Sequence, residues 1–280
     1  MRSGRWAGIE AGGTKFVAAV GSGPEDLARV RFDTVSPEET LRSVTEWLQD
    51  NGPFDAVGVG AFGPLDLESG TITTTPKLAW RGFALKKNLE DALGVPVVVD
   101  TDVNAAALGE HCWGAARGVK SFLYMTIGTG IGGGAMVDGR LLHGRQHPEM
   151  GHLVTPLHPL DREFEGVCPS HGTCLEGVAS GPALEARWGK AARELPAEHP
   201  AWEHEAFYLG FALANFIYAF SPERIILGGG VMEQGHLYPA VQERVETILN
   251  GYVAAPPIIP PEQPHCGVLG ALALARGAGG

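Results

Sequence analysis

The chain has 280 residues, of which 44% are hydrophobic and 19% charged, and its formal net charge is −11. This composition excludes an intrinsically disordered chain, and because no run of Lys and Arg interrupts the acidic balance we expect no nucleic-acid partner. No apolar stretch reaches about 18 residues, so we expect no membrane span. The four cysteines are too few for a disulfide scaffold, so we expect a cytoplasmic protein. The length of the chain suits one large domain or two modest ones.

Two apolar runs surround the first glycine-rich segment. The runs 7–11 and 16–20 flank the sequence Gly-Gly-Thr-Lys at 12–15, which predicts a β-hairpin. A turn without Cβ atoms can present several backbone N–H groups to one anion, and Thr14 and Lys15 add side-chain donors. The segment therefore predicts a phosphate loop, with an ordinary hairpin turn as the alternative.

Helical and strand patterns alternate along the rest of the chain, which indicates an α/β protein. Helices are expected at 38–50, near 86–93, from about 104, at 177–194, at 203–219, near 238–250 and over the C-terminal residues 268–280, and strands at 56–60, 97–100, 122–127 and 224–227.

Asp102 follows the apolar strand 97–100 within the sequence Asp-Thr-Asp-Val-Asn. Ligands in α/β proteins gather at the carboxyl ends of strands, where a carboxylate can accept a proton from a substrate hydroxyl. Asp102 is thus a candidate general base, and a helix N-cap is the alternative.

A second glycine loop, 128–134, follows the strand 122–127, and a third glycine run lies at 228–230. Strand, glycine turn with Thr, and strand occur at 8–20 and again at 122–137, which suggests two related halves, with two unrelated hairpins as the alternative. Neither of the first two loops fits a Walker or Rossmann pattern. Three separated glycine loops nevertheless predict a nucleotide held by a two-lobed protein.

Residues 147–176 contain a cluster of potential metal ligands. Cys168, His171 and Cys174 follow one another at intervals of three residues. A tetrahedral zinc site is typically made of such closely spaced Cys and His ligands, with a fourth ligand from a His elsewhere in the chain. We predict a zinc site with His152 or His158 as the fourth ligand. A Cys168–Cys174 disulfide is the alternative, disfavoured in a reducing compartment.

Together these motifs resemble the ROK family of sugar kinases and repressors, from about residue 7 to 275 and in the family's order. Within the family the chain is most similar to bacterial fructokinases. The segments that carry the resemblance are Glu10–Lys15, Asp102–Glu110, Gly128–Gly134, Glu149–His152, and Cys168, His171 and Cys174 followed by Leu175-Glu176.

The resemblance implies an actin-like (ribonuclease H-like) fold with two α/β lobes, each carrying a phosphate-binding β-hairpin. The implied lobes are 1–117, joined by the C-terminal helix 268–280, and 118–267, which includes the zinc-binding segment 147–176. Because the first hairpin begins by residue 7, we expect no N-terminal DNA-binding helix-turn-helix of the kind that repressors carry.

The resemblance also implies a role for each motif. Asp102 would be the general base, and zinc would be structural. Phosphate binding would involve Gly12, Gly13, Thr14, Lys15, Thr129 and Gly130; adenosine binding Gly228, Gly229 and Gly230; sugar binding Gly63, Pro64, Asp102, Glu149, His152 and Glu176; and zinc binding His152, Cys168, His171 and Cys174.

The implied activity is phosphorylation of a hexose by ATP with Mg²⁺, with D-fructose favoured at its 6-hydroxyl. Thr101 stands where glucose-specific members usually have Asn, which weakens a glucose assignment. The zinc motif is shorter than the family's usual one, and His171 replaces a Cys. The alternatives are a kinase for glucose, mannose or an N-acetylated amino sugar, a non-catalytic sugar-binding module, and a zinc hydrolase. Family members are often homodimers.

Overall fold

The structure is a computed structural model that describes residues 4–75 and 77–278. The chain divides into two compact units. The ends of the predicted N-terminal lobe and C-terminal helix, residues 1–3 and 279–280, lie outside the described residues. Within the described part of the chain, no helix combines the length and apolar character needed to cross a membrane. The first unit comprises Met1–Gly118, Leu141–His147 and Glu262–Gly280, and the second comprises Val119–Arg140 and Pro148–Pro261.

The boundaries of these units differ from the predicted ones at Gly118 and at two longer segments. The sequence places 141–147 and 262–267 in the second lobe, whereas the structure assigns both to the first unit. The buried carboxylate of Glu110 accounts for the second difference, because it accepts the amides of Glu262 and Gln263 at 3.1 and 2.9 Å. The chain is therefore attached to the first unit before its last helix begins.

The first unit is built on a five-stranded sheet in the order β3-β2-β1-β4-β8. The predicted hairpin is confirmed, because β1 and β2 are antiparallel, whereas β1–β4 and β4–β8 are parallel. Every residue of β4 is buried, as is typical of a parallel strand covered on both faces. The strands are β1 (Trp6–Ala11), β2 (Lys15–Gly21), β3 (Ala28–Asp33), β4 (Val57–Ala61) and β8 (Val97–Thr101).

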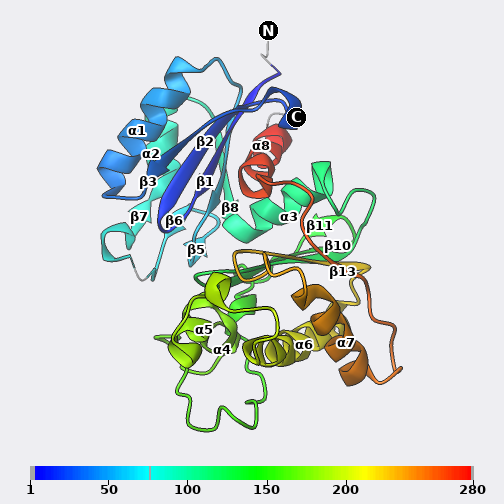
Figure 1. The fold of residues 1–280 in the computed structure, drawn as a ribbon. Helices are drawn as coiled ribbons and strands as arrows, with labels where there is room; N and C mark the ends of the chain where they lie inside the picture. The colour runs from blue at the N-terminus through cyan, green and yellow to red at the C-terminus, as the bar shows by residue number, and fades with distance from the viewer. Residues whose placement is uncertain (1–3, 76, 279–280) are drawn as a thin grey trace. The chain divides into compact units, whose positions relative to one another are not determined.

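Helices cover both faces of this sheet (Figure 1). Helices α1 and α2 pack on one face, and α3 and α8 pack on the other. The approach of α8 is close, since a Cβ on Gly8 of β1 would lie 2.8 Å from the carbonyl oxygen of Val268. Glycine is therefore required where the strand meets the helix. The helices are α1 (Pro37–Asp50), α2 (Leu85–Leu93), α3 (Asp102–Trp113) and α8 (Cys266–Ala278).

The second unit repeats the strand order with the sheet β11-β10-β9-β12-β13. Strands β9 and β10 form the second predicted hairpin, and β12 runs parallel to β9 as β4 runs parallel to β1. The sequence repeat therefore reflects two halves with related topology rather than two unrelated hairpins. The strands are β9 (Phe122–Ile127), β10 (Ile131–Val137), β11 (Arg140–Leu141), β12 (Arg224–Gly228) and β13 (Ile258–Ile259).

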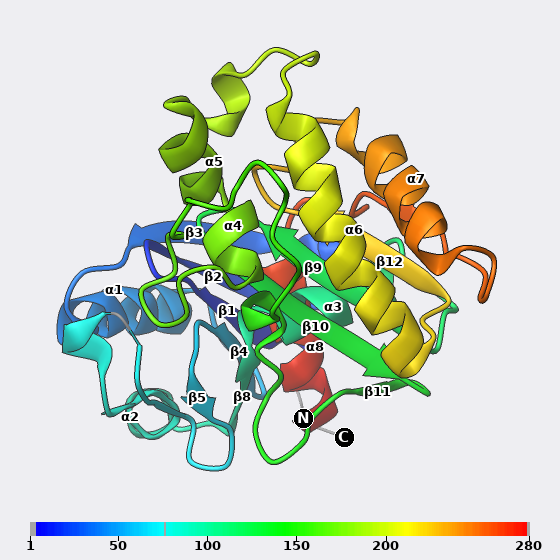
Figure 2. The same ribbon diagram turned by 90° about the horizontal axis from the view of Figure 1, so that it is seen from below.

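Helices α6 and α7 of the second unit lie side by side (Figure 1 and Figure 2). The predicted single helix at 177–194 is wrong, because Ser180 ends α4 and caps α5. Its hydroxyl accepts the amide of Ala183 at 3.4 Å, and Pro182 lies in the first turn of α5. The helices are α4 (Leu175–Ala179), α5 (Gly181–Trp188), α6 (Ala201–Phe220) and α7 (Leu237–Leu249).

Short elements complete the two units. A small sheet of β5, β6 and β7 lies in the first unit, where buried Trp80 stacks on Phe16 with ring centroids 5.3 Å apart. The short strands are β5 (Leu65–Asp66), β6 (Thr71–Ile72) and β7 (Phe83–Ala84), and the 3-10 helices are η1 (Pro24–Asp26), η2 (Leu78–Trp80), η3 (Met150–His152) and η4 (Ala192–Glu194).

Candidate active site

Three parallel strands of the first unit end at the same edge of their sheet. The register pairs Ala11 of β1 with Ala61 of β4, and Ala61 with Thr101 of β8. The segments that leave these three strands are the glycine turn at 12–14, the loop that contains Gly63-Pro64, and the start of α3. The strand register therefore collects predicted phosphate-binding, sugar-binding and catalytic residues along one edge, as in other α/β sheets.

The glycine turn between β1 and β2 is held from the side of β3. The amide of Gly12 donates to the carbonyl of Lys15 at 2.9 Å, and a Cβ on Gly12 would lie 2.8 Å from that same oxygen. Thr34 donates its amide to the carbonyl of Thr14 and its hydroxyl to the carbonyl of Gly12, at 3.0 and 2.8 Å. The side chains of Thr14 and Lys15 are exposed, so both donors are accessible to an anion.

Asp102 is the first residue of α3, directly after β8. The alternative of an N-cap role is wrong, because Thr101 is the cap and its hydroxyl accepts the amide of Asn104 at 3.1 Å. The half-buried Asp102 instead accepts the amide of Val103 at 2.9 Å. Its carboxylate thus lies in the first turn of the helix, where the helix dipole favours negative charge.

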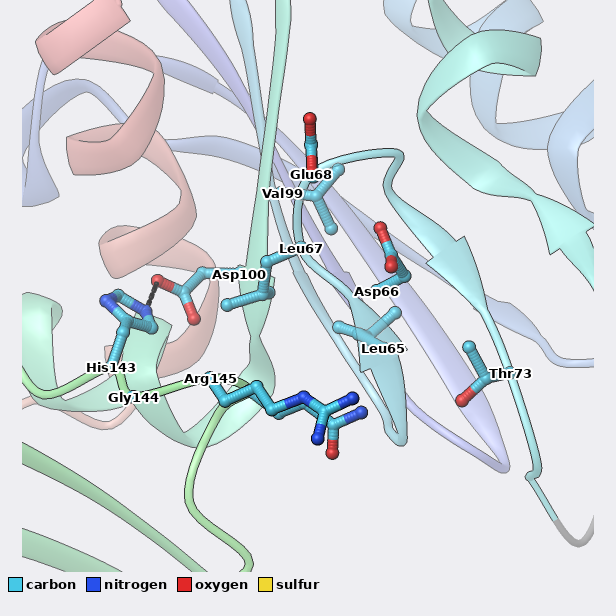
Figure 3. A pocket seen from close by; sticks show the side chains of 11 residues that line it. Leu65, Asp66, Leu67, Glu68, Thr73, Val99, Asp100, His143, Gly144 and Arg145 are labelled. Carbon is cyan, nitrogen blue, oxygen red and sulfur yellow. Dashed lines mark hydrogen bonds and ion pairs between the residues drawn. The ribbon is translucent and has the colours of Figure 1, made fainter.

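A buried carboxylate fixes the junction between β8 and α3. One oxygen of Asp100 accepts the amide of Thr101 at 2.7 Å and the side-chain amide of Asn104 at 2.8 Å. The other oxygen lies 2.9 Å from Nε2 of His143. The two side chains point toward each other in Figure 3. Sequence reasoning missed His143, because it lies about forty residues away in a segment without a recognisable motif.

A cavity of about 540 Å³ adjoins this junction in the first unit. Figure 3 shows acidic Asp66 and Glu68 on one side and His143 and Arg145 on the other. The predicted sugar-binding residue Pro64 directly precedes Leu65, which lines the cavity.

The loop at Gly63-Pro64 is anchored by hydrogen bonds on both sides. Thr73 donates its amide and its hydroxyl to the carbonyl of Pro64, at 2.8 and 3.0 Å. The buried ring of His147 accepts the amide of Leu65 at 2.9 Å. These contacts give the predicted sugar-binding segment a defined position at the sheet edge.

The second glycine loop, between β9 and β10, rests on Glu176 of α4. Its Oε2 accepts the amide of Ile131 at 3.0 Å, and a Cβ on Gly130 would lie 2.7 Å from the same oxygen. Gly128 accepts the amide of Gly181 at 2.7 Å, which joins the loop to the start of α5. Glu176 is predicted as a sugar-binding residue, and the structure places part of its carboxylate against the second glycine loop.

The third glycine run meets the second loop in the same unit. Gly229 has a φ of +91°, and a Cβ there would collide with the carbonyl of Ile127, so only glycine fits. Val231 donates its amide to that carbonyl at 3.0 Å.

A cavity of about 380 Å³ lies beside these loops, and its lining includes Thr129 and Gly230. Its lining also includes Pro182, Glu185 and Arg193, which sequence reasoning missed because it predicted an unbroken helix there. The Ser-Gly-Pro sequence at 180–182 was the available signal, since it is typical of a helix start.

The predicted metal ligands converge in the second unit. The ligand atoms of His152, Cys168, His171 and Cys174 all lie within 4.8 Å of one another. Nδ1 of His152 is 3.4 Å from Sγ of Cys174 and 3.8 Å from Sγ of Cys168. Both cysteines are free thiols rather than a disulfide, and His158 belongs to a different group of residues. The geometry therefore selects His152 over His158.

Burial raises the proton affinity of the Cys174 thiol. Desolvation, with the nearby Cys168 as a further contribution, raises the pKa of Cys174 to about 11. The thiol is therefore protonated at neutral pH unless a cation displaces the proton. Two thiols and two imidazoles form a donor set that suits a tetrahedral metal ion.

Glu149 lies in the same turn as one of these ligands. It precedes η3, and its carbonyl accepts the amide of His152 at 3.1 Å. A cation bound by His152 would therefore restrain the backbone that carries Glu149.

A model of the ROK family matches residues 6–278. The chain belongs to the ROK family. It is 43% identical to a fructokinase of Zymomonas mobilis, over 96% of each protein. The ROK hexokinase from Thermus thermophilus aligns with a TM-score of 0.84 at 33% identity, covering 98% of each chain. The ROK family glucokinase from Streptomyces griseus, solved with glucose and AMPPNP, aligns with a TM-score of 0.78 at 27% identity, covering 98% of this chain and 100% of that chain.

Membership of the ROK family confirms the resemblance that the motifs carry, and the related topology of the two sheets agrees with the actin-like fold expected from it. The first unit of this ROK protein holds the predicted residues Gly12 to Lys15, Gly63, Pro64 and Asp102, and the second holds the other predicted site residues. Their roles in binding and catalysis stay predictions.

Proposed function

We propose that this ROK protein is an ATP-dependent hexose kinase whose substrate is D-fructose, phosphorylated at the 6-hydroxyl. The observation that carries the proposal is the register of β1, β4 and β8, which gathers the turn at 12–14, the Gly63-Pro64 loop and Asp102 at one edge. A kinase needs a phosphate loop, a sugar-binding segment and a base in one place. The identity of 43% with a protein named fructokinase supports fructose as the hexose.

Asp102 acts as the general base in this proposal. Its carboxylate accepts the proton of the sugar hydroxyl while the hydroxyl oxygen forms a bond to the γ-phosphorus and the bond from phosphorus to the ADP oxygen breaks. The network of Asp100, Thr101 and Asn104 holds the backbone on which Asp102 stands. Positioning of this kind supplies a large part of the rate in phosphoryl transfer.

Both glycine hairpins are phosphate-binding elements in this proposal. Gly12, Gly13, Thr14 and Lys15 would bind phosphate oxygens in the first unit, and Thr129 and Gly130 would do so in the second. Bound with ATP, Mg²⁺ supplies positive charge to the phosphate oxygens. The cavity beside Gly230 would take the adenosine, and Gly228 and Gly229, which directly precede Gly230, would position that residue.

The proposed sugar-binding residues are Gly63, Pro64 and Asp102 of the first unit and Glu149, His152 and Glu176 of the second. A second candidate substrate is glucose, because the chain aligns over 98% of its length with a glucokinase that was solved with glucose. Thr101 weakens this glucose assignment, because the glucose-type ROK proteins that the sequence resembles usually have Asn at this position. A homodimer, which ROK proteins often form, stays a prediction.

We infer that the group of His152, Cys168, His171 and Cys174 holds a structural zinc ion. The two thiols are buried, and the four donors suit tetrahedral coordination without an open position. Zinc there would brace the segment between Glu149 and Glu176, and would take no part in the reaction.

The test is ADP release from Mg-ATP with fructose, glucose, mannose or N-acetylglucosamine as the sole acceptor. The proposal expects the highest kcat/KM with fructose. Preference for another hexose would retain the kinase and overturn the fructose assignment. No sugar-dependent ADP release from folded protein would overturn the kinase and favour a sugar-binding module.

A further inference from the structure

A second group of potential metal ligands lies in the second unit and shares no residue with the Cys and His group. The ligand atoms of His158, Glu203 and His204 lie within 4.8 Å of one another. His158 lies in the segment between η3 and α4, whereas Glu203 and His204 lie in the first turn of α6. The group therefore connects two segments about forty-five residues apart.

Glu203 presents one carboxylate oxygen to both imidazole rings. Its Oε1 pairs with the guanidinium of Arg244 at 2.9 Å, which fixes the carboxylate. Its Oε2 lies 3.2 Å from Nε2 of His158 and 3.9 Å from Nδ1 of His204. The three atoms have the separations of ligands around a small divalent cation.

His204 turns one ring nitrogen toward Glu203 and the other toward a second carboxylate. Its ring is buried, and among the described residues its Nδ1, which faces Glu203, has no hydrogen-bond partner. Its other nitrogen faces the carboxylate of Asp161 at 3.8 Å. Asp161 is itself held by Arg187 at 3.0 Å and by the hydroxyl of Tyr208 at 2.6 Å. At 3.8 Å the contact is electrostatic rather than a hydrogen bond, and it places a carboxylate near the far nitrogen, where metal-bound imidazoles commonly have one.

We propose that His158, Glu203 and His204 form a second zinc site in this protein. Two imidazoles and one carboxylate suit zinc, and the Glu203 side chain is 57% exposed, so water can reach a fourth position. The ion ties the segment that contains His158 to α6. The site is independent of the proposed kinase activity.

The current hydrogen bonds predict a change in one ring when zinc binds. Nδ1 of His158 accepts the amide of Leu160 at 3.3 Å, so its Nε2 carries the proton and lies 3.2 Å from Oε2 of Glu203. Zinc takes the lone pair of Nε2, and the proton is carried on Nδ1 instead. The amide of Leu160 then loses its acceptor on His158 and donates to water instead. Leu160 is 79% exposed, so water reaches this part of the chain.

The first test counts zinc ions per chain after loading and removal of free metal. The wild-type protein is expected to retain two ions, Glu203→Gln one, and the control Glu243→Gln two. Glu243 is an exposed glutamate of α7 outside the group, so the two variants change charge equally. Loss of an outer-sphere partner lowers metal affinity by roughly 10–100-fold. Glu203 is a direct ligand in this proposal, so its loss is expected to lower the affinity for the second zinc ion by more than that. Equal zinc retention, with equal affinity, in the wild type and in Glu203→Gln would overturn the proposal, whatever the occupancy of the Cys and His group.

The second test needs no variant and follows binding in the wild-type protein. Titration with Co²⁺ is expected to show thiolate charge-transfer absorption for one equivalent, and a further equivalent without it. Imidazole ¹⁵N spectra are expected to show His158 changing from the Nε2–H to the Nδ1–H tautomer with the second equivalent of zinc. An unchanged tautomer at two bound equivalents would contradict the assignment of ligands.

Discussion

Nε2 of His143 lies 2.9 Å from Oδ2 of Asp100, and the other oxygen of that buried carboxylate accepts the amide of Thr101. Thr101 caps α3, and Asp102 is the next residue. The contact therefore links the segment 141–147 to the residue proposed as the general base, although more than forty residues separate them in the chain.

His143→Ala is expected to lower kcat by about 10–100-fold with little change in the KM for fructose, because small displacements of a reacting group carry large rate costs. His143→Gln keeps a side-chain donor and is expected to recover part of the loss. Steady-state kinetics of the three proteins decide the matter. Equal kcat in wild type and His143→Ala would show that the pair does not position Asp102.

Gly229→Ala is expected to raise the KM for ATP and to lower stability by about 1–3 kcal/mol, because Ala is strained at a φ of +91° and its Cβ would meet the carbonyl of Ile127. Gly235→Ala is the matched control, since a Cβ there has open space around it. Kinetics with varied ATP and urea unfolding measure the two effects. Similar KM values for ATP in both variants would show that the turn at Gly229 does not contribute to nucleotide binding.

Cys174→Ser is expected to abolish zinc retention at the Cys and His group and to lower the Tm, because a structural zinc site contributes directly to folding. Cys112→Ser, which changes a thiol outside the group, is expected to retain zinc. Elemental analysis and thermal unfolding provide the readouts. An unchanged Tm on removal of zinc from the wild type would argue against a structural role.

The sequence was most informative where local pattern and tertiary structure agree. The glycine pair at 12–13 between apolar runs predicted the first hairpin, and three-residue spacing predicted that Cys168, His171 and Cys174 would meet. Both features depend on residues close together in the chain.

Sequence reasoning failed where distant residues decide the structure. Nothing near His143 indicates that it contacts Asp100, and nothing near Glu110 indicates that it holds Glu262 to the first unit. The prediction of one helix at 177–194 was wrong for a local reason. It relied on the apolar pattern of the segment and overlooked Ser180, which caps a new helix.

The most direct test of the proposed mechanism compares Asp102→Asn with the wild type for ADP release and for fructose binding. If Asp102 is the general base, turnover is expected to fall by about 10²–10⁴-fold. The dissociation constant of fructose, measured by calorimetry, is expected to change little, because Asn keeps the size and polarity of the side chain. Turnover within a few fold of the wild type would contradict the central claim that Asp102 removes the proton from the sugar hydroxyl.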